Sequence, residues 1–239
     1  MSTAVQRQRA FYDETSPRYD VIHSHDTDEH GQAMAYLLGM IDFLGARSIL
    51  DVGCGTGWAL LKLRAHFPEL SIMGVEPSAA QRAVAYAKGI SETELVEGDA
   101  QKLSFDDGAF DVVCEFGALH HMPRPASAVA EMLRVARKAV FICDANCFGQ
   151  GGPVARLAKQ ALHGAGLWPL AVWAKSGGKG YHVSEGDGVQ FSYSVFSDLP
   201  QIRRRCSEVR LLSLTGSPSP NLYRSASHVG VLGILGDRK

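Results

Sequence analysis

Short apolar runs alternate with helical stretches along the middle of the chain. Apolar positions recur from Trp58 to Phe67 on a predicted helix that Pro68 ends. This order of strand and helix predicts a doubly wound, Rossmann-like α/β fold in which helices cover both faces of a parallel sheet. The runs expected to be strands are rich in apolar residues, as buried parallel strands are, and cover residues 48–52, 71–76, 93–97, 110–115 and 139–144.

Local signals at the helix ends agree with this pattern. Ser78 and Gln81 have the spacing of a capping box, and Gly89 is placed to close the helix that they begin. A further helix is expected at residues 126–137, just past Pro123 and Pro125. Helices that can serve as crossovers therefore follow the first, second and fourth predicted strands.

The last part of the chain has a different order. Two strand-like runs, residues 209–214 and 228–235, are joined by a turn-rich segment that is too short for a parallel crossover. We therefore expect a hairpin at the sheet edge. With the five earlier strands it gives a seven-stranded sheet that is mostly parallel and has an antiparallel last strand.

Two segments flank or interrupt the alternation. Residues 1–45, with helices expected at 4–12 and 32–44, are interpreted as an N-terminal helical cap. Residues 145–194 carry many glycines and a helix-like piece at 154–173, and we interpret them as an inserted lid. A lid of about fifty residues would hardly support its own core, so residues 1–239 are expected to form a single domain.

Composition and charge narrow the function classes. Lys and Arg total 24 against 25 Asp and Glu, which gives no concentrated positive field for nucleic acid. The first ten residues lack the apolar core of a secretory signal, and the longest apolar stretches fall well short of the ~20 residues that cross a bilayer. We expect a cytoplasmic protein with no integral membrane association and five reduced cysteines.

A glycine-rich bend follows the first strand. Asp51 is followed by Gly53, Gly55 and Gly57, and a helix begins at once. Glycines there let the backbone turn tightly, so that a ligand can lie against the peptide groups. A dinucleotide fingerprint would need a small third residue where Trp58 stands, which counts against a nicotinamide cofactor.

The Asp-x-Gly-x-Gly-x-Gly spacing resembles the first motif of the class I S-adenosylmethionine-dependent methyltransferase superfamily. The resemblance covers roughly residues 11–143. It implies S-adenosyl-L-methionine as cofactor, S-adenosyl-L-homocysteine as product and a small-molecule methyl acceptor. The expected cofactor-binding residues that match the family's motifs are Tyr12, Tyr19, Asp51, Gly53, Gly55, Gly57, Glu76, Pro77, Asp99, Ala100 and Glu115.

The resemblance implies a role for several of these residues. Glu76 ends the second strand and would accept hydrogen bonds from the ribose diol, and Asp99 would accept from the adenine amine. Asp51 would fix the glycine bend and the methionine amino group. Tyr12 and Tyr19 resemble elements that close over the methionine part, although packing of the cap explains them equally well.

Methyl transfer from a sulfonium demands alignment and exclusion of water, and sometimes a base. Residues 115–122, after the fourth strand, lack the Asn/Asp-Pro-Pro-aromatic motif of enzymes that methylate amino groups of nucleobases or glutamine. His120 or His121 could remove a proton from a hydroxyl acceptor. The alternative, slightly favoured here, is that this pair only shapes the loop.

No metal is expected. Cys143 and Cys147 have no second pair at zinc spacing. A cluster of histidines among acidic residues could hold a metal and consists of His23, His25 and His30. A solvated hinge between the helices of the cap is the simpler explanation.

The acceptor is expected under the lid, against an apolar wall. This wall would consist of Leu162, Leu167, Trp168, Leu170 and Trp173, unless they fill the lid's own core or rest on a membrane surface.

The favoured function is therefore O- or N-methylation of a small, apolar or aromatic metabolite, as in secondary metabolism. One alternative is C-methylation of a quinone or lipid-like acceptor. A nicotinamide-dependent oxidoreductase and a non-catalytic cofactor-binding protein are the others, and a homodimer is left open.

Overall fold

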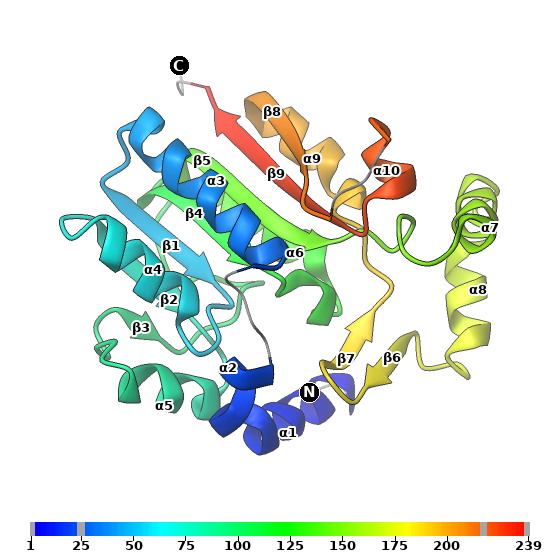
Figure 1. The fold of residues 1–239 in the computed structure, drawn as a ribbon, viewed down its shortest axis with the longest axis horizontal. Coiled ribbons are helices and arrows are strands. Elements are labelled where there is room, and N and C mark those ends of the chain that lie inside the picture. The colour runs from blue at the N-terminus through cyan, green and yellow to red at the C-terminus, as the bar shows by residue number, and fades with distance from the viewer. Residues whose placement is uncertain (1–2, 23–26, 216–218, 237–239) are drawn as a thin grey trace.

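The computed structural model describes residues 3–22, 27–215 and 219–236, and a seven-stranded sheet forms its centre (Figure 1). In their order across the sheet the strands are β3 (Leu95–Val96), β2 (Ser71–Val75), β1 (Ser48–Val52), β4 (Phe110–Phe116), β5 (Ala136–Ala145), β9 (His228–Leu235) and β8 (Cys206–Ser213). The neighbours from β3 to β5 pair in parallel, whereas β9 is antiparallel to both β5 and β8. The predicted doubly wound sheet with an antiparallel last strand is confirmed.

Several element boundaries differ from the prediction, and two of them, those of β3 and α6, have a clear physical cause. The run expected at 93–97 forms only a two-residue strand, because β3 lies at the sheet edge and pairs with Gly74 and Val75 of β2. The helix expected to reach residue 137 ends at Val135. The next residue already belongs to β5, because Ala136 pairs with Phe110 of β4.

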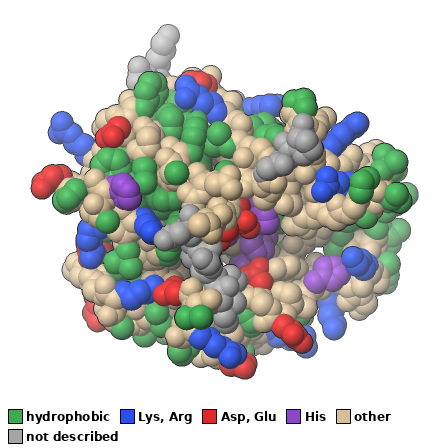
Figure 2. All heavy atoms as spheres, in the orientation of Figure 1, with side chains coloured by type: hydrophobic (Ala, Val, Ile, Leu, Met, Phe, Trp, Pro, Cys, Tyr) green, Lys and Arg blue, Asp and Glu red, His purple; other side chains and the backbone are tan. Residues whose placement is uncertain are grey.

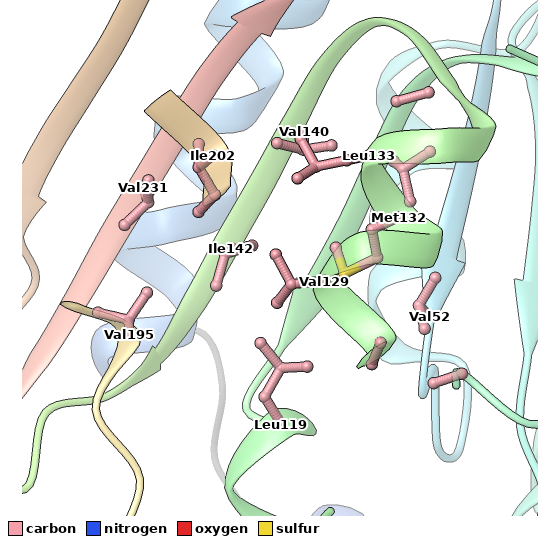
Figure 3. Packing of buried hydrophobic residues seen from close by; sticks show 14 of the residues in the cluster. Val52, Leu119, Val129, Met132, Leu133, Val140, Ile142, Val195, Ile202 and Val231 are labelled. Atoms are coloured by element: carbon pink, nitrogen blue, oxygen red, sulfur yellow. The ribbon is translucent and has the colours of Figure 1, made fainter. Parts of the chain in front are cut away.

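Helices cover both faces of the sheet and divide the core in two. On one face are α6 (Pro125–Val135) and α9 (Leu199–Arg205), and Figure 3 shows Val129 and Met132 of α6 packed with Val140 of β5. On the other face are α3 (Glu29–Leu44), α4 (Trp58–His66) and α5 (Ala79–Ala87). Phe141 of β5 belongs to this second cluster, because successive strand residues point to opposite faces.

The segment 145–194 contains more structure than the sequence indicated. The helix-like piece expected at 154–173 is two helices, and Gly166 lies between them with φ +71°. They are followed by a hairpin that forms its own two-stranded sheet. The elements are α7 (Pro153–Gly164), α8 (Trp168–Lys175), β6 (Tyr181–Ser184) and β7 (Gly188–Phe191).

The N-terminal elements lie in two places. α1 (Thr3–Thr15) contacts α5 and β7 at the end of the sheet, whereas α3 packs in the core (Figure 1). His23 and His25 of the expected histidine cluster lie outside the described residues. The remaining short elements are η1 (Ser16–Arg18), α2 (Tyr19–Ile22), η2 (Leu119–His121), η3 (Val195–Ser197) and α10 (Leu222–Ser225).

Two further findings concern the chain as a whole. Within the described residues, no helix combines the length and apolar character needed to span a membrane. All five cysteines are free thiols.

The glycine bend places a specific demand on Gly57. Its φ is +79°, and a methyl group there would lie 2.1 Å from the Cδ1 atom of buried Ile90. Gly57→Ala should therefore lower the free energy of unfolding by roughly 1–3 kcal/mol in urea titrations. Gly39→Ala is the matched control, because Gly39 is an exposed residue within α3 with open space around it. It should be neutral or stabilise by up to about 1 kcal/mol, and an equal loss in both variants would contradict the account.

Candidate functional site

The carboxyl ends of β1, β2 and β4 meet at a cavity of about 440 Å³, here called the bend cavity. On the face shown in Figure 2, histidine and acidic side chains gather in the hollow between the body of the sheet and the segment that carries α7 and α8. Of the residues predicted from the sequence, those that line the bend cavity are Tyr12, Tyr19, Gly53, Gly55, Glu76, Pro77, Asp99, Ala100 and His121.

The glycine bend, residues 53–57, is fixed on the end of β2. The backbone N–H groups of Gly53 and Cys54 donate to the carbonyl of Val75 at 2.8 and 3.2 Å. Gly53 has φ +75°, and a methyl group there would meet the side chain of Ala118 at 2.6 Å. Gly57 packs against Ile90 and does not line the bend cavity, so its position serves packing.

Glu76 lies at the inner wall of the cavity and is 4% exposed. Its carboxylate accepts backbone hydrogen bonds from Ser78 at 2.8 Å and Gly55 at 3.1 Å. Burial nevertheless raises its pKa to about 7. The expected capping box is therefore only half formed, because the Ser78 hydroxyl accepts from Gln81 N–H while Ser78 N–H donates to Glu76.

The other two acids differ in their surroundings. Asp51 is 2% exposed beside a smaller cavity of about 60 Å³, and burial raises its pKa to about 7. Asp99 is exposed at the bend cavity, where it accepts a hydrogen bond from the backbone of Gln101. Carboxylates around a bend oppose the binding of a pyrophosphate and favour a ligand with hydroxyl or cationic groups.

Gln81 is a wall residue that the sequence analysis used only as a helix cap. It is 1% exposed, and both polar atoms of its side chain lack a hydrogen-bond partner among the described residues. It lines the bend cavity from the first turn of α5, opposite Gly55. An amide with unused hydrogen bonds that faces a cavity indicates a polar ligand. The sequence signal that could have indicated this role is the place of Gln81 in the first turn of the helix after Pro77.

Tyr12 and Tyr19 line the cavity from α1 and α2. Their ring centroids lie 6.1 Å apart in an edge-on arrangement, and Tyr12 lies edge-on to His121 at 6.3 Å. Thr56 of the glycine bend donates to the carboxylate of Asp20 in α2 at 2.5 Å. The N-terminal segment is thus fastened to the glycine bend through a contact that sequence spacing did not indicate.

Glu115 lies beneath the loop after β4 and does not line the bend cavity. It is 0% exposed, and its carboxylate accepts the backbone N–H of Ala118 at 2.9 Å. Burial holds its pKa well above the usual value. Glu115 was expected among the cofactor-binding residues, in the loop after the fourth strand, but β4 continues through Phe116, and the Glu115 carboxylate supports that loop from inside.

His120 and His121 lie between the loop and the hairpin. The Nδ1 of His120 lies 2.8 Å from a carboxylate oxygen of Asp144, and His121 Nδ1 donates to the carbonyl of Val189 at 2.6 Å. Burial alone would lower the pKa of His120, but Asp144 and Asp187 raise it to about 10. This proton occupancy counts against His120 as a general base near neutral pH.

A second cavity of about 1040 Å³, here called the lid cavity, lies under α7 and α8. It shares Tyr19, Phe116 and Gly117 with the bend cavity, so the two meet beside the loop after β4. Leu162 and Trp168 line it, as expected. The other three residues of the predicted apolar wall point outward and are 49–61% exposed, namely Leu167, Leu170 and Trp173.

Comparison with known proteins relates the sheet and the bend to one family. Residues 50–143 match the family described as "Methyltransferase domain". A demethylmenaquinone methyltransferase of Renibacterium salmoninarum is 30% identical over 131 residues, which cover 54% of this chain and 53% of that protein. The matched part covers 28–59% of the length of this and the other curated relatives.

Two solved structures share the fold. One from Thermotoga maritima, described as a possible histamine N-methyltransferase, covers 95% of this chain and 99% of its own, with a TM-score of 0.56 and 17% identity. The plantazolicin methyltransferase BpumL, solved with a desmethyl analogue and S-adenosyl-L-homocysteine (SAH), covers 98% of this chain and 96% of its own. Its TM-score is 0.59 and its identity is 14%.

The raised pKa values of Asp51 and Glu76 predict how stability depends on pH. Between the usual carboxyl values near 4 and the folded values near 7, the folded protein holds more protons than the unfolded chain. The free energy of unfolding should therefore fall as pH rises from 5 to 7, by up to about 1 kcal/mol per pH unit for each group.

Urea titrations of the unliganded protein across this range test the effect. Asp51→Asn should make the free energy of unfolding depend less steeply on pH. Glu92→Gln, which changes an exposed carboxylate, should leave this dependence as it is in the wild type. An Asp51→Asn protein with the slope of the wild type would contradict the assignment.

Proposed function

We propose that this chain is a class I S-adenosylmethionine-dependent methyltransferase that transfers a methyl group to a small, apolar or aromatic metabolite, since residues 50–143 match the methyltransferase domain family. The observation that carries the proposal is the meeting of the two cavities at Tyr19, Phe116 and Gly117. One cavity holds a glycine bend and carboxylates, and the other is larger and carries apolar side chains such as Leu162 and Trp168 beside polar ones. A cofactor and an acceptor can therefore approach each other without bulk water between them.

The bend cavity suits S-adenosyl-L-methionine in its polar groups. We assign the ribose diol to Glu76, the adenine amine to Asp99 and the methionine end to the glycine bend near Asp51. The unpartnered amide of Gln81 supports the fit, because it offers both a donor and an acceptor to a polar ligand. Tyr12 and Tyr19 would cover the ligand from the N-terminal side.

The cofactor supplies a methyl group already activated on a sulfonium, so that the acceptor forms a bond to the methyl carbon as the sulfur–carbon bond breaks. The residues of this chain would align the acceptor and exclude water. We place the acceptor in the lid cavity, against Leu162 and Trp168. The buried Nε1–H of Trp168 has no partner within the described part of the chain, so it can donate to a polar atom of the acceptor.

C-methylation of a quinone or lipid-like acceptor is a second candidate. The demethylmenaquinone methyltransferase relative supports it. So does the outer face of α7 and α8, where Val154, Leu157, Leu170 and Trp173 are 57–84% exposed. Such a face suits a long apolar substrate or the surface that delivers it. The carbon-13 chemical shift of the transferred methyl group, measured by NMR, distinguishes a new C–methyl bond from an O- or N-methyl group.

Two finer points remain part of the proposal. We infer a cytoplasmic location because all five cysteines are free thiols. The sequence leaves a homodimer open, and analytical ultracentrifugation would measure the mass of the particle in solution.

Cofactor binding gives the first test. Calorimetric titration with S-adenosyl-L-methionine should show one site, and Glu76→Ala and Asp99→Ala should each weaken binding by roughly 1–3 kcal/mol, or about 5- to 150-fold. Glu92→Ala removes an exposed carboxylate outside the cavity and should bind as the wild type does. A wild type without affinity, or two variants with unchanged affinity, would overturn the assignment.

Turnover gives the second test. Incubation with the cofactor and a panel of phenols, amines and quinols should release S-adenosyl-L-homocysteine with at least one acceptor, as measured by mass spectrometry. Trp168→Phe keeps most of the aromatic surface but removes the indole N–H. It should lower kcat/KM about tenfold for that acceptor without changing cofactor affinity. Cofactor binding with no product from any acceptor would favour a non-catalytic binding protein.

A further inference from the structure

Three side chains converge where the loop after β4 meets the hairpin. His120 and His121 come from η2, and Asp187 comes from the turn between β6 and β7. The Nε2 atoms of the two histidines each lie 3.3 Å from a different carboxylate oxygen of Asp187. The sequence analysis gave Asp187 no role, because 67 residues separate it from His120.

The 3.3 Å separations are long for ionic hydrogen bonds. A charge-assisted N–H···O bond usually measures about 2.7–2.9 Å. Two ligands of one tetrahedral metal ion, each bonded at about 2.0–2.1 Å, lie about 3.3 Å apart. The separations therefore suit ligands of one metal ion, and among the described residues these three side chains form the one group of His, Cys, Asp and Glu whose ligand atoms lie close enough together to hold an ion.

The outer atoms of all three side chains are held by further groups. His120 Nδ1 lies 2.8 Å from Asp144, and His121 Nδ1 donates to the carbonyl of Val189 at 2.6 Å. Gln190 donates to the carboxylate of Asp187 at 2.5 Å. Histidines that bind metals usually donate their other ring nitrogen to a carboxylate or a carbonyl, and ligating carboxylates are themselves hydrogen-bonded. Both Nε2 atoms are thereby left to face the carboxylate of Asp187.

The position leaves room for a further ligand. His121 lines the bend cavity, whereas His120 and Asp187 line the lid cavity. Three protein ligands with an open position toward a cavity are typical of catalytic metal sites. The carboxylates of Asp144 and Asp187 also balance the charge of a divalent ion, which on binding would displace the Nε2 proton that the same carboxylates favour on His120 in the metal-free protein.

We propose that His120, His121 and Asp187 bind a divalent transition-metal ion such as Zn²⁺ at the junction of the two cavities. Metal binding itself does not depend on methyl transfer. If the proposed function holds, the open position would take a hydroxyl or carbonyl oxygen of the acceptor, and the metal would lower the pKa of such a hydroxyl. That last role rests on the proposed function.

Titration of the chelator-treated full-length protein with zinc chloride tests the site. Calorimetry should show one equivalent of Zn²⁺ bound, and thermal unfolding should shift upward with added zinc. His121→Gln and Asp187→Asn should each weaken zinc binding at least tenfold. His182→Gln, on the same hairpin and also lining the lid cavity, is the matched control and should bind zinc as the wild type does.

Cofactor titration of the same proteins keeps the two proposals apart. A wild type that binds no zinc, or His121→Gln and Asp187→Asn proteins that bind it with wild-type affinity, would overturn the metal site. Asp187→Asn that lowers thermal stability while zinc has no effect on the wild type would also overturn it, and would leave an ionic clamp. In each case retained affinity for S-adenosyl-L-methionine shows that the protein is folded and that the proposed function is unaffected.

Discussion

The parallel pairing of β1 with both β2 and β4 is the constraint on which the site depends. Asp51 is level with Gly74 on one side and with Cys114 on the other. The glycine bend after β1 therefore has the carbonyl of Val75 beside it, and it is held there by two backbone hydrogen bonds. A shift of one residue in this register would move Glu76 and the bend apart and turn the strand's core side chains to the opposite face.

Regular pairing inside the sheet explains why so much of the fold could be predicted from the sequence. The bounds of β1 and β9 match the expected runs, because the turn-forming residues on either side of a buried strand fix where it begins and ends. The edge strand β3 and the junction of α6 with β5 were predicted less well. Their ends are decided by the neighbouring strand, and local sequence carries little information about that.

The sequence predicted the parts of the site that lie on consecutive motifs. It missed the parts that depend on contacts between distant segments of the chain. The positions of Gly53, Gly55 and Glu76 at one cavity follow from strand order alone. Asp187 reaches the histidine pair only because the hairpin is fastened to α1, where the Gln8 amide accepts the N–H of Val189 and donates to the carbonyl of Asp187. Such contacts, across about 180 residues, have no sequence period to reveal them.

Asp51 and Asp144 show how the fold divides its buried charge. Both are strand-end aspartates with at most 2% exposure. Asp144 lies 2.8 Å from the ring of His120 and accepts the backbone N–H of Ala145, and these contacts hold its pKa below the usual value despite burial. The hydrogen bond recorded for Asp51 is a long one from the thiol of Cys114, and its pKa is raised to about 7. Because a buried carboxylate without strong donors is costly, the fold stabilises the charged form of Asp144 beside the loop and favours the protonated form of Asp51 beside the glycine bend.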